Sequence, residues 1–374
     1  MEERNREKDE GAGWQLRSSE AEGIFPETVT AWFKERRRDL PWRRTYDPYQ
    51  VWVSEVMLQQ TQMDRVVEYF NRWLALFPDV ANLAAASEQA VLKAWEGLGY
   101  YARARNLMRA ARVVVEEHGG VIPDRYEQLL ALPGVGPYTA AAIMSIAFDR
   151  PYPVIDANVE RLFARLWDVE RPMKERAVRE KLEEVLGGMA RRVSPRDFNQ
   201  GLMELGALVC TPRSPSCSDC PLAQSCLARK AGTEAARPVR TAKKKTIEIV
   251  MACVVLKENG KIFIQQRHRD DVWGGLWEFP GGRLKDEETP EEAARRELAE
   301  ETELRVGALV PLATVTHTYT RYRVTLHGFH GRLAPGCRPE PVLHAARQYR
   351  WVRPAELALH AFPSGHRQLI ERML

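Results

Sequence analysis

The sequence predicts a multi-domain protein in which an all-α domain is followed by an α+β domain. From Pro26 to about Arg229, apolar residues recur at spacings of three and four, with almost no alternation of period two. After Ile247 the pattern changes to short β-rich segments around one charged helix. Residues 230–246 between them are rich in Ala, Thr, Arg and Lys, which is typical of a basic, mobile linker. We therefore expect a helical domain at 24–229 and an α+β domain at 247–374.

Length and composition fit a soluble protein of two or three domains. The chain has 374 residues, of which 44% are hydrophobic and 28% charged. The longest apolar run, Ile249–Leu256, is far too short to cross a bilayer. Residues 1–23 lack the apolar stretch of a secretory signal, so we expect a disordered tail and a cytoplasmic protein. A net charge of +4 and a pI near 8.7 permit a polyanionic partner without requiring one.

In the helical domain, apolar spacing predicts the helices, and glycines and prolines predict the turns between them. The helical stretches are Val51–Phe70, Val91–Ala94, Ala102–Val115 and Ala140–Phe148. Helix-breaking residues separate them at Pro78, Gly97, Gly99, Gly119, Gly120 and Pro123 and between Pro133 and Pro137.

The α+β domain opens on a predicted β-hairpin. Ile247–Leu256 and Lys261–Gln266 are β-rich, and the four residues between them end in Asn-Gly, which is a hairpin signal. A helix is predicted at Thr289–Glu300, which begins with an N-cap threonine, a first-turn proline and a capping-box glutamate. Two further strands are expected at Leu312–Thr316 and Tyr322–Phe329.

Four cysteines close the helical domain with the spacing Cys210-x6-Cys217-x2-Cys220-x5-Cys226. A packed core does not need thiols at these intervals, whereas a soft metal centre needs four thiolates on a short loop. Two disulfides would suit a small secreted domain better than this large chain. Zinc stays open, although it usually prefers two Cys-x2-Cys pairs. We favour one four-iron four-sulfur cluster bound by all four cysteines.

A glycine-containing turn at Leu132–Ala140 lies between two predicted helices. Its glycines allow a tight hairpin whose N–H groups point outward, beside the positive end of the next helix. Such a turn can hold a phosphate without reading base sequence. A simple helix–turn–helix connection is the alternative. Asp156 and the four cysteines further along the chain favour the functional interpretation.

These motifs together resemble the endonuclease III superfamily of base-excision DNA glycosylases. Leu132–Ala140 is similar to its helix-hairpin-helix element, Val154–Val159 to its catalytic-aspartate segment, and residues 210–226 to its iron–sulfur loop. Val53–Gln62 and Trp95–Tyr101 are similar to the adenine-excising MutY branch. The resemblance runs from about Ile24 over nearly the whole chain. It implies an all-α helix-hairpin-helix glycosylase domain that a linker joins to an α+β Nudix-like domain.

Cleavage of an N-glycosidic bond needs an acid that protonates the base and a carboxylate that faces the cationic sugar. Glu55 has mostly apolar neighbours, which would raise its pKa, and we assign it as the general acid at adenine N7. An ordinary exposed helix glutamate is the alternative. Asp156 would begin a helix at Ala157–Phe163 and stabilise, or transiently bond, the sugar carbon; its alternative is a plain N-cap.

The resemblance also assigns residues around these two acids. Tyr138 and Asn158 match family positions that orient and polarise the catalytic groups. Tyr138 stands where the bifunctional lyases carry a lysine, and a phenol cannot form a Schiff base with the sugar. The enzyme is therefore expected to be monofunctional.

Because the target base lies inside the duplex, it must be flipped out. By resemblance, Gln60 and Tyr100 wedge at the orphan base, with Leu98 and Thr61 near it. A role for Leu98 and Tyr100 in the core is the alternative. Contacts with the DNA backbone are expected from the hairpin residues Gly134, Val135 and Gly136.

Trp273–Pro280 resembles the Nudix-like domain that, in this family, checks for 8-oxoguanine opposite the adenine. The family's recognition loop usually carries Phe-Ser-His, and Tyr319-Thr320-Arg321 aligns with it. Tyr319 keeps an aromatic wedge and Thr320 keeps a hydroxyl group. Arg321 replaces the histidine and can contact a phosphate or a guanine edge.

Residues 282–303 match a Nudix hydrolase box except at its late glycine, which is Glu303 here. On a helix, Glu297, Glu300 and Glu301 fall on one face, which suits Mg²⁺. We favour a solvated acidic helix retained from ancestry over residual metal binding or nucleotide hydrolysis.

The resemblance implies a monofunctional adenine DNA glycosylase of base excision repair. It would act as a monomer on double-stranded DNA with adenine opposite 8-oxoguanine or guanine, at the nucleoid of a bacterial cytoplasm. The alternatives are a glycosylase of the same scaffold for thymine or adenine opposite guanine, a non-catalytic redox-sensing DNA-binding module, and a Nudix hydrolase with an accessory DNA-binding domain. The lesion-checking domain favours the first function, and Glu55 with Asp156 disfavours a non-catalytic module.

Overall fold

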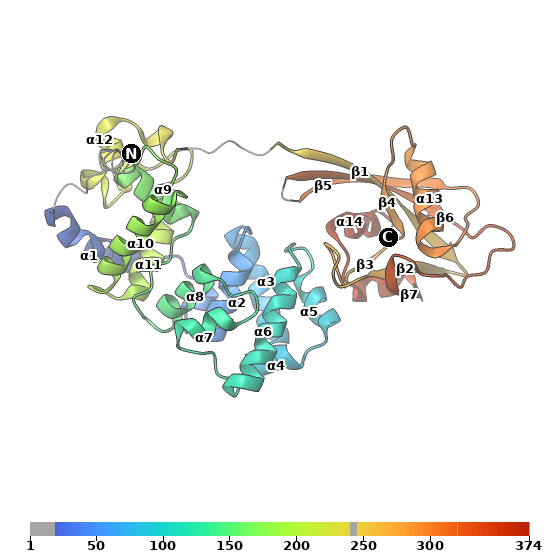
Figure 1. The fold of residues 1–374 in the computed structure, drawn as a ribbon, viewed down its shortest axis with the longest axis horizontal. Coiled ribbons are helices and arrows are strands. Elements are labelled where there is room, and N and C mark those ends of the chain that lie inside the picture. Colours follow the sequence, from blue (N-terminus) through green and yellow to red (C-terminus); the bar gives the residue numbers. More distant parts are fainter. Residues whose placement is uncertain (1–18, 240–244, 320, 374) are drawn as a thin grey trace, which may run out of the picture. The chain divides into compact units, whose positions relative to one another are not determined.

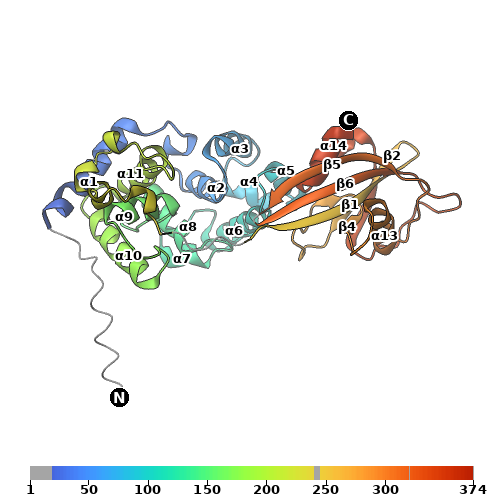
Figure 2. The same cartoon turned by 90° about the horizontal axis from the view of Figure 1, so that it is seen from above.

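A computed structural model describes residues 19–239, 245–319 and 321–373 (Figures 1 and 2). The chain forms two compact units. The first comprises the described part of Met1–Asn71 together with Val113–Ala242, and the second comprises Arg72–Arg112 together with the described part of Lys243–Leu374. The domain boundaries predicted at 24–229 and 247–374 stay predictions.

The first unit is built from helices, as the sequence predicts. Its elements, of which α3 and α6 extend into the second unit, are α1 (Ser19–Arg36), η2 (Pro41–Arg43), α2 (Pro48–Leu58), α3 (Met63–Leu76), α6 (Ala102–His118), α7 (Tyr126–Ala131), α8 (Pro137–Ala142), η3 (Ile143–Ala147), α9 (Ala157–Leu166), α10 (Arg176–Ala190), α11 (Pro195–Leu208), η4 (Cys217–Asp219), η5 (Ala223–Ser225), α12 (Leu227–Ala231) and η6 (Glu234–Ala236).

Two buried clusters hold this unit together. The larger one joins α1, α9, α10 and α11 through residues that include Val29, Phe163, Leu182 and Phe198. The smaller one packs Val51 of α2 against α8, η3 and the segment that precedes α9. Burial of such apolar side chains drives the packing, because each one removes apolar surface from water. The two clusters fix the positions of α2, α8, α9 and α11, which carry the site described below.

Two predicted segments of this unit differ in the structure. The apolar stretch Val51–Phe70 is not one helix, because α2 ends at Leu58 and α3 begins at Met63. Between them Gln60 has a φ angle of 59°, which is left-handed backbone that a helix cannot contain. Residues 19–23, predicted as part of a tail, instead open α1, since Glu and Ala extend the helix readily. The rest of that predicted tail, residues 1–18, lies outside the described residues.

The first part of the predicted linker is also folded. Arg237 is buried and forms ion pairs with Asp168 at 2.8 Å and Glu170 at 2.9 Å. The Thr233 hydroxyl donates a hydrogen bond to the same Asp168 carboxylate at 2.6 Å. Specific ion pairing therefore replaces the mobility that composition suggested for residues 233–237. Residues 240–244 lie outside the described part of the chain.

The second unit contains a mixed sheet. Its helices are α4 (Val80–Ala85), α5 (Glu88–Trp95), α13 (Pro290–Thr302), η7 (Pro354–Leu359) and α14 (Ser364–Met373). The part of α6 up to Arg112 also belongs to this unit. Its strands are β1 (Ile247–Glu258), β2 (Lys261–Arg267), β3 (Trp277–Glu278), β4 (Gly281–Arg283), β5 (Val310–Tyr319), β6 (Tyr322–Gly331) and β7 (Ala346–Val352). The strand order is β3-β2-β1-β6-β5, with β4 also paired to β1 and β7 to β2.

Helices α13 and α14 cover opposite faces of this sheet (Figure 2). Successive β1 side chains alternate between them: Val254 packs in the cluster of α13, and Val255 packs in the cluster of α14. This alternation follows from the period of two in a strand. The predicted hairpin and the capping box of α13 are both confirmed, with Thr289 and Glu292 bonded reciprocally. None of the helices in the described ranges is long and apolar enough to cross a membrane.

Candidate active site

A cavity of about 770 Å³ in the first unit collects most of the sequence-predicted catalytic residues. That volume lies in the range of pockets that bind small organic groups. The cavity is lined by residues of α2, α8, α9 and α11 and of the segments between helices. The predicted residues in its lining are Glu55, Gln60, Thr61, Gly134, Gly136, Tyr138, Asp156 and Asn158. Val135, the middle residue of the predicted hairpin, is buried instead.

Glu55 lies on α2 and is only 3% exposed. Burial penalises the charged form and raises the pKa of Glu55 to about 7, although the Tyr138 hydroxyl donates a hydrogen bond to its Oε2 at 3.1 Å and opposes this effect. The nearby Asp156 carboxylate raises the pKa of Glu55 further. Burial also holds the pKa of Tyr138 well above its usual value, so its phenol remains a hydrogen-bond donor. Near neutral pH, Glu55 is thus a half-protonated acid inside the cavity.

Asp156 is the N-cap of α9, and three N–H groups hold its carboxylate. The backbone N–H groups of Asn158 and Val159 donate to Oδ1 at 2.9 and 2.8 Å, and Asn158 Nδ2 donates to Oδ2 at 2.8 Å. Asp156 is therefore the helix N-cap that the alternative interpretation expected, and it also lines the cavity. The positive end of the α9 dipole also faces this carboxylate.

Asn158 is fixed from behind by two neighbours. Arg161 Nη2 donates to Asn158 Oδ1 at 2.7 Å and to the Gly206 carbonyl at 2.8 Å. A Cβ atom on Gly206 would lie 2.6 Å from the Cβ of Asn158, so only glycine lets α11 approach α9 this closely. The orientation of Asn158 toward Asp156 therefore depends on residues that the sequence analysis did not single out.

A second buried acid in the same cavity was missed from the sequence. Glu204 on α11 is 1% exposed and lies between Arg38 and Arg43, whose guanidinium groups donate to its carboxylate at 2.8 to 3.1 Å. Burial alone would raise the pKa of Glu204, but the hydrogen bonds from both arginines outweigh it and lower the pKa to about 2. The pKa of Glu204 is thus shifted in the opposite direction from that of Glu55, because Glu204 has two arginine partners.

We expect the substitution Glu204→Gln to destabilise the first unit by about 3 kcal/mol at pH 7, because it leaves Arg38 and Arg43 without their buried counter-charge. The pKa of Glu204 is depressed in the folded state, so its contribution is present above the unfolded pKa near 4.5 and is lost as the pH falls toward about 2. Urea unfolding followed by tryptophan fluorescence at pH 7 and pH 3 measures the difference.

The matched control for this prediction is Glu170→Gln. Glu170 also pairs with an arginine, but its side chain is 81% exposed, so the loss is expected to stay below about 1 kcal/mol. Equal destabilisation by the two substitutions would contradict the role assigned to burial at Glu204.

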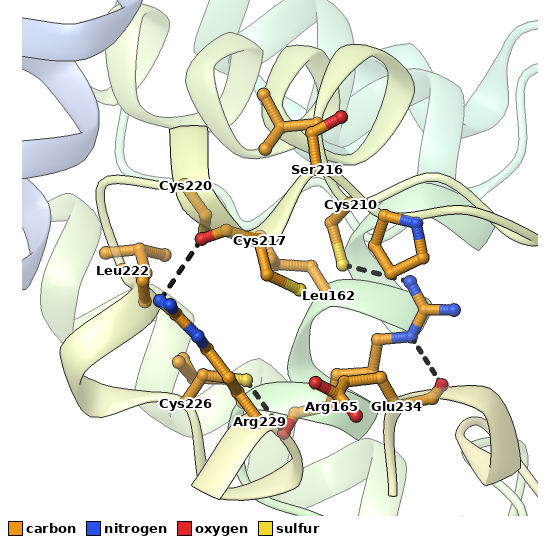
Figure 3. Close-up of a pocket in the computed structure, with 14 residues that line it drawn as sticks. Leu162, Arg165, Cys210, Ser216, Cys217, Cys220, Leu222, Cys226, Arg229 and Glu234 are labelled. Atoms are coloured by element: carbon orange, nitrogen blue, oxygen red, sulfur yellow. Dashed lines mark hydrogen bonds between the residues drawn. The ribbon is translucent and has the colours of Figure 1, made fainter. Parts of the chain in front are cut away.

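The four predicted metal-ligating cysteines, Cys210, Cys217, Cys220 and Cys226, line one cavity at the end of the helical unit (Figure 3). All four are free thiols, so the disulfide alternative is wrong in this structure. Figure 3 shows them around the cavity with Arg165 and Arg229 beside them. Soft thiolates next to arginine side chains fit an anionic metal–sulfur group, and these four residues are the ones that would hold it.

Arg165 links this loop to the rest of the unit. It is 2% exposed, and its Nη1 lies 3.3 Å from Cys210 Sγ and donates to the Thr211 carbonyl at 2.7 Å. Its Nε donates to the Glu234 carbonyl at 2.9 Å. Arg161, one turn earlier on α9, donates to the Cys210 carbonyl at 2.8 Å. Helix α9 therefore carries Asp156 at its start and the supports of the cysteine loop further along.

The remaining predicted DNA-binding residues belong to the second unit. The rings of Tyr100 and Tyr319 contact each other with centroids 5.1 Å apart, and Arg321 is exposed beside Tyr322. Leu98 is buried, which agrees with its alternative as a core residue. Thr320 lies outside the described residues.

The alternative of a Mg²⁺ site on α13 is not supported. In the described part of the chain, Glu297, Glu300 and Glu301 do not form a group that could hold one metal ion. Arg296 instead donates to Glu297 at 2.7 Å and to Glu300 at 3.0 Å. Glu301 turns inward, where burial raises its pKa to about 8 and Gln265 and the Gly281 N–H donate to it. Arginine pairing and burial thus engage all three carboxyl groups.

Comparison with known proteins assigns this architecture to a class. Residues 53–187 match the HhH-GPD superfamily of base excision DNA repair proteins, residues 210–226 match the iron–sulfur binding domain of endonuclease III, and residues 251–372 match the NUDIX domain. The fold and the site together define a DNA N-glycosylase of base excision repair with an iron–sulfur cluster and a Nudix-like domain. The favoured class of cofactor, iron and sulfur rather than zinc, is confirmed.

Individual relatives identify the family within this class of DNA glycosylases. The adenine DNA glycosylase of Buchnera aphidicola subsp. Acyrthosiphon pisum is 32% identical, over 71% of this chain and 76% of the relative. The human adenine DNA glycosylase is 34% identical, over 89% of this chain and 70% of the relative. The chain belongs to the adenine DNA glycosylase family. A solved structure of a thermostable thymine-DNA glycosylase matches 56% of this chain and 97% of its own, with 30% identity and a TM-score of 0.50.

We expect Arg165→Gln to weaken retention of the iron–sulfur cluster by about 10-fold or more, because side chains that hydrogen-bond to metal ligands tune metal affinity on this scale. The substitution removes the donors to Cys210 Sγ and the Thr211 carbonyl. Iron per chain after dialysis against a chelator measures the loss. Arg229→Gln is the matched control, since Arg229 is exposed and donates to the Cys217 carbonyl at 3.2 Å rather than to a cysteine sulfur. Equal iron in both variants would refute the role of Arg165.

Proposed function

We propose that this chain is a monofunctional adenine DNA glycosylase that acts on adenine paired with 8-oxoguanine or with guanine. One observation carries the proposal: the buried acid Glu55, with a pKa near 7, and the N–H-bonded carboxylate of Asp156 line a single cavity. Such a cavity suits a base that has left the helical stack. Membership of the adenine DNA glycosylase family supports adenine as that base.

The proposed reaction uses the two acids in different protonation states. Glu55 donates its proton to adenine N7, so the electrons of the breaking bond between C1′ and N9 flow into a neutral leaving base. Asp156 remains a carboxylate and faces, or transiently bonds, the cationic C1′. Water then adds its oxygen to C1′ and returns a proton to Glu55. Tyr138, bonded to Glu55, and Asn158, bonded to Asp156, orient the two acids.

The residue at position 138 supports a single activity. A lyase needs an amine that attacks C1′ and forms a Schiff base, and the phenol of Tyr138 cannot supply one. The Tyr138 hydroxyl is also engaged with Glu55. The product of the proposed reaction is free adenine and an uncut strand with an abasic site.

Contacts with DNA are proposed for the rim of the cavity and for the hairpin. Gln60 and Thr61, which lie between α2 and α3, line the cavity and are proposed to lie near the orphan base. The hairpin residues Gly134, Val135 and Gly136 precede α8, and Gly134 has a φ angle of 77°. Backbone N–H groups in such a turn suit a phosphate and read no sequence. In the second unit, Tyr100, Tyr319, Thr320 and Arg321 are proposed to contact the base opposite adenine.

The four cysteines are proposed to bind one [4Fe–4S] cluster. When bound, this cluster supplies a rigid, anionic centre around which the loop of residues 210–226 folds. The chain's own contribution is the pair Arg161 and Arg165, which hold the Cys210 carbonyl and its sulfur. The cluster therefore has a structural role in the proposal, and the chemical step involves only Glu55 and Asp156.

Single-turnover excision tests the proposed specificity. We expect the fastest base release from adenine opposite 8-oxoguanine, slower release opposite guanine and the slowest opposite cytosine. A duplex with thymine opposite guanine tests the alternative that the thermostable thymine-DNA glycosylase suggests. Faster release of thymine than of adenine would overturn the proposal. The enzyme is further proposed to act on nucleoid DNA in a bacterial cytoplasm. It is proposed to be a monomer, and light scattering with and without DNA tests this by measuring its mass.

A further inference from the structure

Three segments that are far apart in the sequence form one aromatic cluster in the second unit. Tyr319 ends β5, Tyr100 precedes α6, and Trp273 lies in the loop between β2 and β3. The Tyr319 ring lies 5.1 Å from the Tyr100 ring and 6.3 Å from the Trp273 ring, which meets it edge-on at 69°. Edge-to-face rings at such distances attract each other beyond their buried area. Tyr319 is therefore in contact with two aromatic neighbours.

The loop that carries Trp273 is held tightly at its base. The Gly274 N–H donates to the Asp271 carbonyl at 3.0 Å, and the Arg267 N–H donates to the Leu276 carbonyl at 3.0 Å. A Cβ atom on Gly274 would lie 2.2 Å from the Arg269 carbonyl oxygen, so the turn closes only with glycine there. Gln266 Nε2 donates to the Gly275 carbonyl at 2.8 Å. The loop is thus a rigid support for its tip.

The tip of this loop is apolar and solvent-facing. Val272 is 69% exposed, and Trp273 is half-buried against Tyr319 and His317. The loop is also bonded to α5, the helix that precedes Tyr100: Gln89 donates to the Gly275 carbonyl at 3.0 Å, and Arg269 pairs with Glu88 at 2.6 Å. Helix α5 therefore supports the loop that carries Trp273 and also leads into the segment that carries Tyr100.

Tyr100 is fixed from its own side as well. Arg103 lies over its ring at 5.5 Å and donates to the Leu98 and Gly99 carbonyls at 3.2 Å each. Trp95 Nε1 donates to the Gly99 carbonyl at 3.0 Å. Rings held in place before a ligand arrives lose less conformational freedom on binding, which strengthens stacking on a base.

From this arrangement we propose that Trp273 is a positioning residue for recognition of the base opposite the excised adenine. It holds the Tyr319 ring in the orientation in which Tyr319 stacks on a nucleobase of that strand, and Val272 extends the apolar surface beside it. The ligand class is an oxidised purine and its neighbouring base in double-stranded DNA. This inference rests on the proposed recognition of 8-oxoguanine by the second unit.

The test compares single-turnover adenine excision opposite 8-oxoguanine and opposite guanine in the full-length protein. For Trp273→Ala we expect the ratio of the two rate constants to fall by about tenfold, the size of one lost base-stacking contact. A merely structural defect lowers the active fraction and leaves this ratio unchanged. Trp351→Ala is the matched control, because Trp351 is a half-buried tryptophan of the same unit that packs on Phe263, away from the cluster, and it is expected to keep the wild-type ratio.

A second measurement keeps the test decisive if Trp273→Ala folds poorly. 2-Aminopurine placed next to 8-oxoguanine is expected to be quenched on binding of the wild-type protein, and this quenching is expected to fall at least twofold in Trp273→Leu or Val272→Ala. A wild-type ratio in Trp273→Ala, or unchanged quenching in both of the other variants, overturns the role of Trp273. A wild-type protein that does not distinguish 8-oxoguanine from guanine overturns the proposed function itself, so the two failures are distinct.

Discussion

The substitution Glu55→Gln is expected to reduce the single-turnover rate constant of adenine excision by on the order of 10³-fold, because an amide cannot donate the proton that N7 needs. In the wild-type protein the same group sets the pH dependence. Since the acid form is the active one and the pKa of Glu55 is about 7, the rate constant should be level below pH 7 and fall about tenfold for each pH unit above it. Rapid-quench measurements from pH 5.5 to 9 test both statements.

The same substitution is expected to make the protein more stable at high pH. The pKa of Glu55 is higher in the folded state than its model value of 4.5. Its contribution to stability is therefore complete below about pH 4.5 and is lost as the pH rises through about 7. The difference between 4.5 and about 7, at 1.36 kcal/mol per pH unit, gives about 3 kcal/mol as an upper bound for the gain in Glu55→Gln at pH 8.

Urea unfolding at pH 5 and pH 8 measures this gain, with Glu117→Gln as the control. Glu117 is an exposed glutamate on α6, so the pH dependence of stability should match that of the wild-type protein. An active Glu55→Gln variant, or one whose stability relative to wild type is the same at both pH values, would show that Glu55 is not the buried acid of the reaction.

The substitution Asp156→Asn is expected to lower excision by a similar factor, on the order of 10³-fold, while leaving the fold almost unchanged. Asparagine is as good an N-cap as aspartate, so the backbone N–H groups of Asn158 and Val159 keep an acceptor. What disappears is the negative charge that faces the cationic sugar, together with the Oδ2 acceptor for Asn158 Nδ2. Asp156→Ala removes the cap as well and should cost a further ~1 kcal/mol of stability.

The control for this second prediction is Asp79→Asn, an exposed N-cap of α4 that accepts from the Asn82 N–H at 2.8 Å. Excision should be unaffected there. If Asp156→Asn excised adenine as fast as Asp79→Asn, the charge of Asp156 would have no part in the reaction. Thermal unfolding of both variants separates a loss of chemistry from a loss of structure.

The residues proposed to carry the chemistry could be named from the sequence because each lies in a local motif. Glu55, Asp156 and the four cysteines have characteristic neighbours and spacing, and the structure places the two acids in one cavity and the thiols in another. Thr289 likewise predicts the start of α13, since its capping box involves only residues 289–292. The capping box, which a few consecutive residues determine, is confirmed, whereas the catalytic roles of Glu55 and Asp156 stay predictions.

The missed features depend on contacts between distant residues. Glu204 is surrounded by apolar residues on α11, and its partner Arg38 is 166 residues away, so neither side chain indicates the other. The only available signal was an acid on the apolar face of a helix. Strand β3 has two residues and β4 has three, and they form because β2 and β1 supply their hydrogen-bond partners. The folding of residues 233–237 similarly depends on Asp168 and Glu170.

Gln60 and Tyr100, the two residues proposed to wedge into DNA, both have left-handed backbone, with φ angles of 59° and 49°. A residue with a side chain costs roughly 1 kcal/mol more than glycine in this conformation. Glycine would relieve this backbone strain at both positions, but at position 100 it would also remove the ring contacts with Tyr319 and Arg103. The chain has a polar side chain at one of these strained positions and an aromatic side chain at the other, so the strain accompanies the two side chains proposed to enter DNA. Glycine at positions 60 and 100 would therefore relax the backbone while removing the side chains proposed to contact the orphan base.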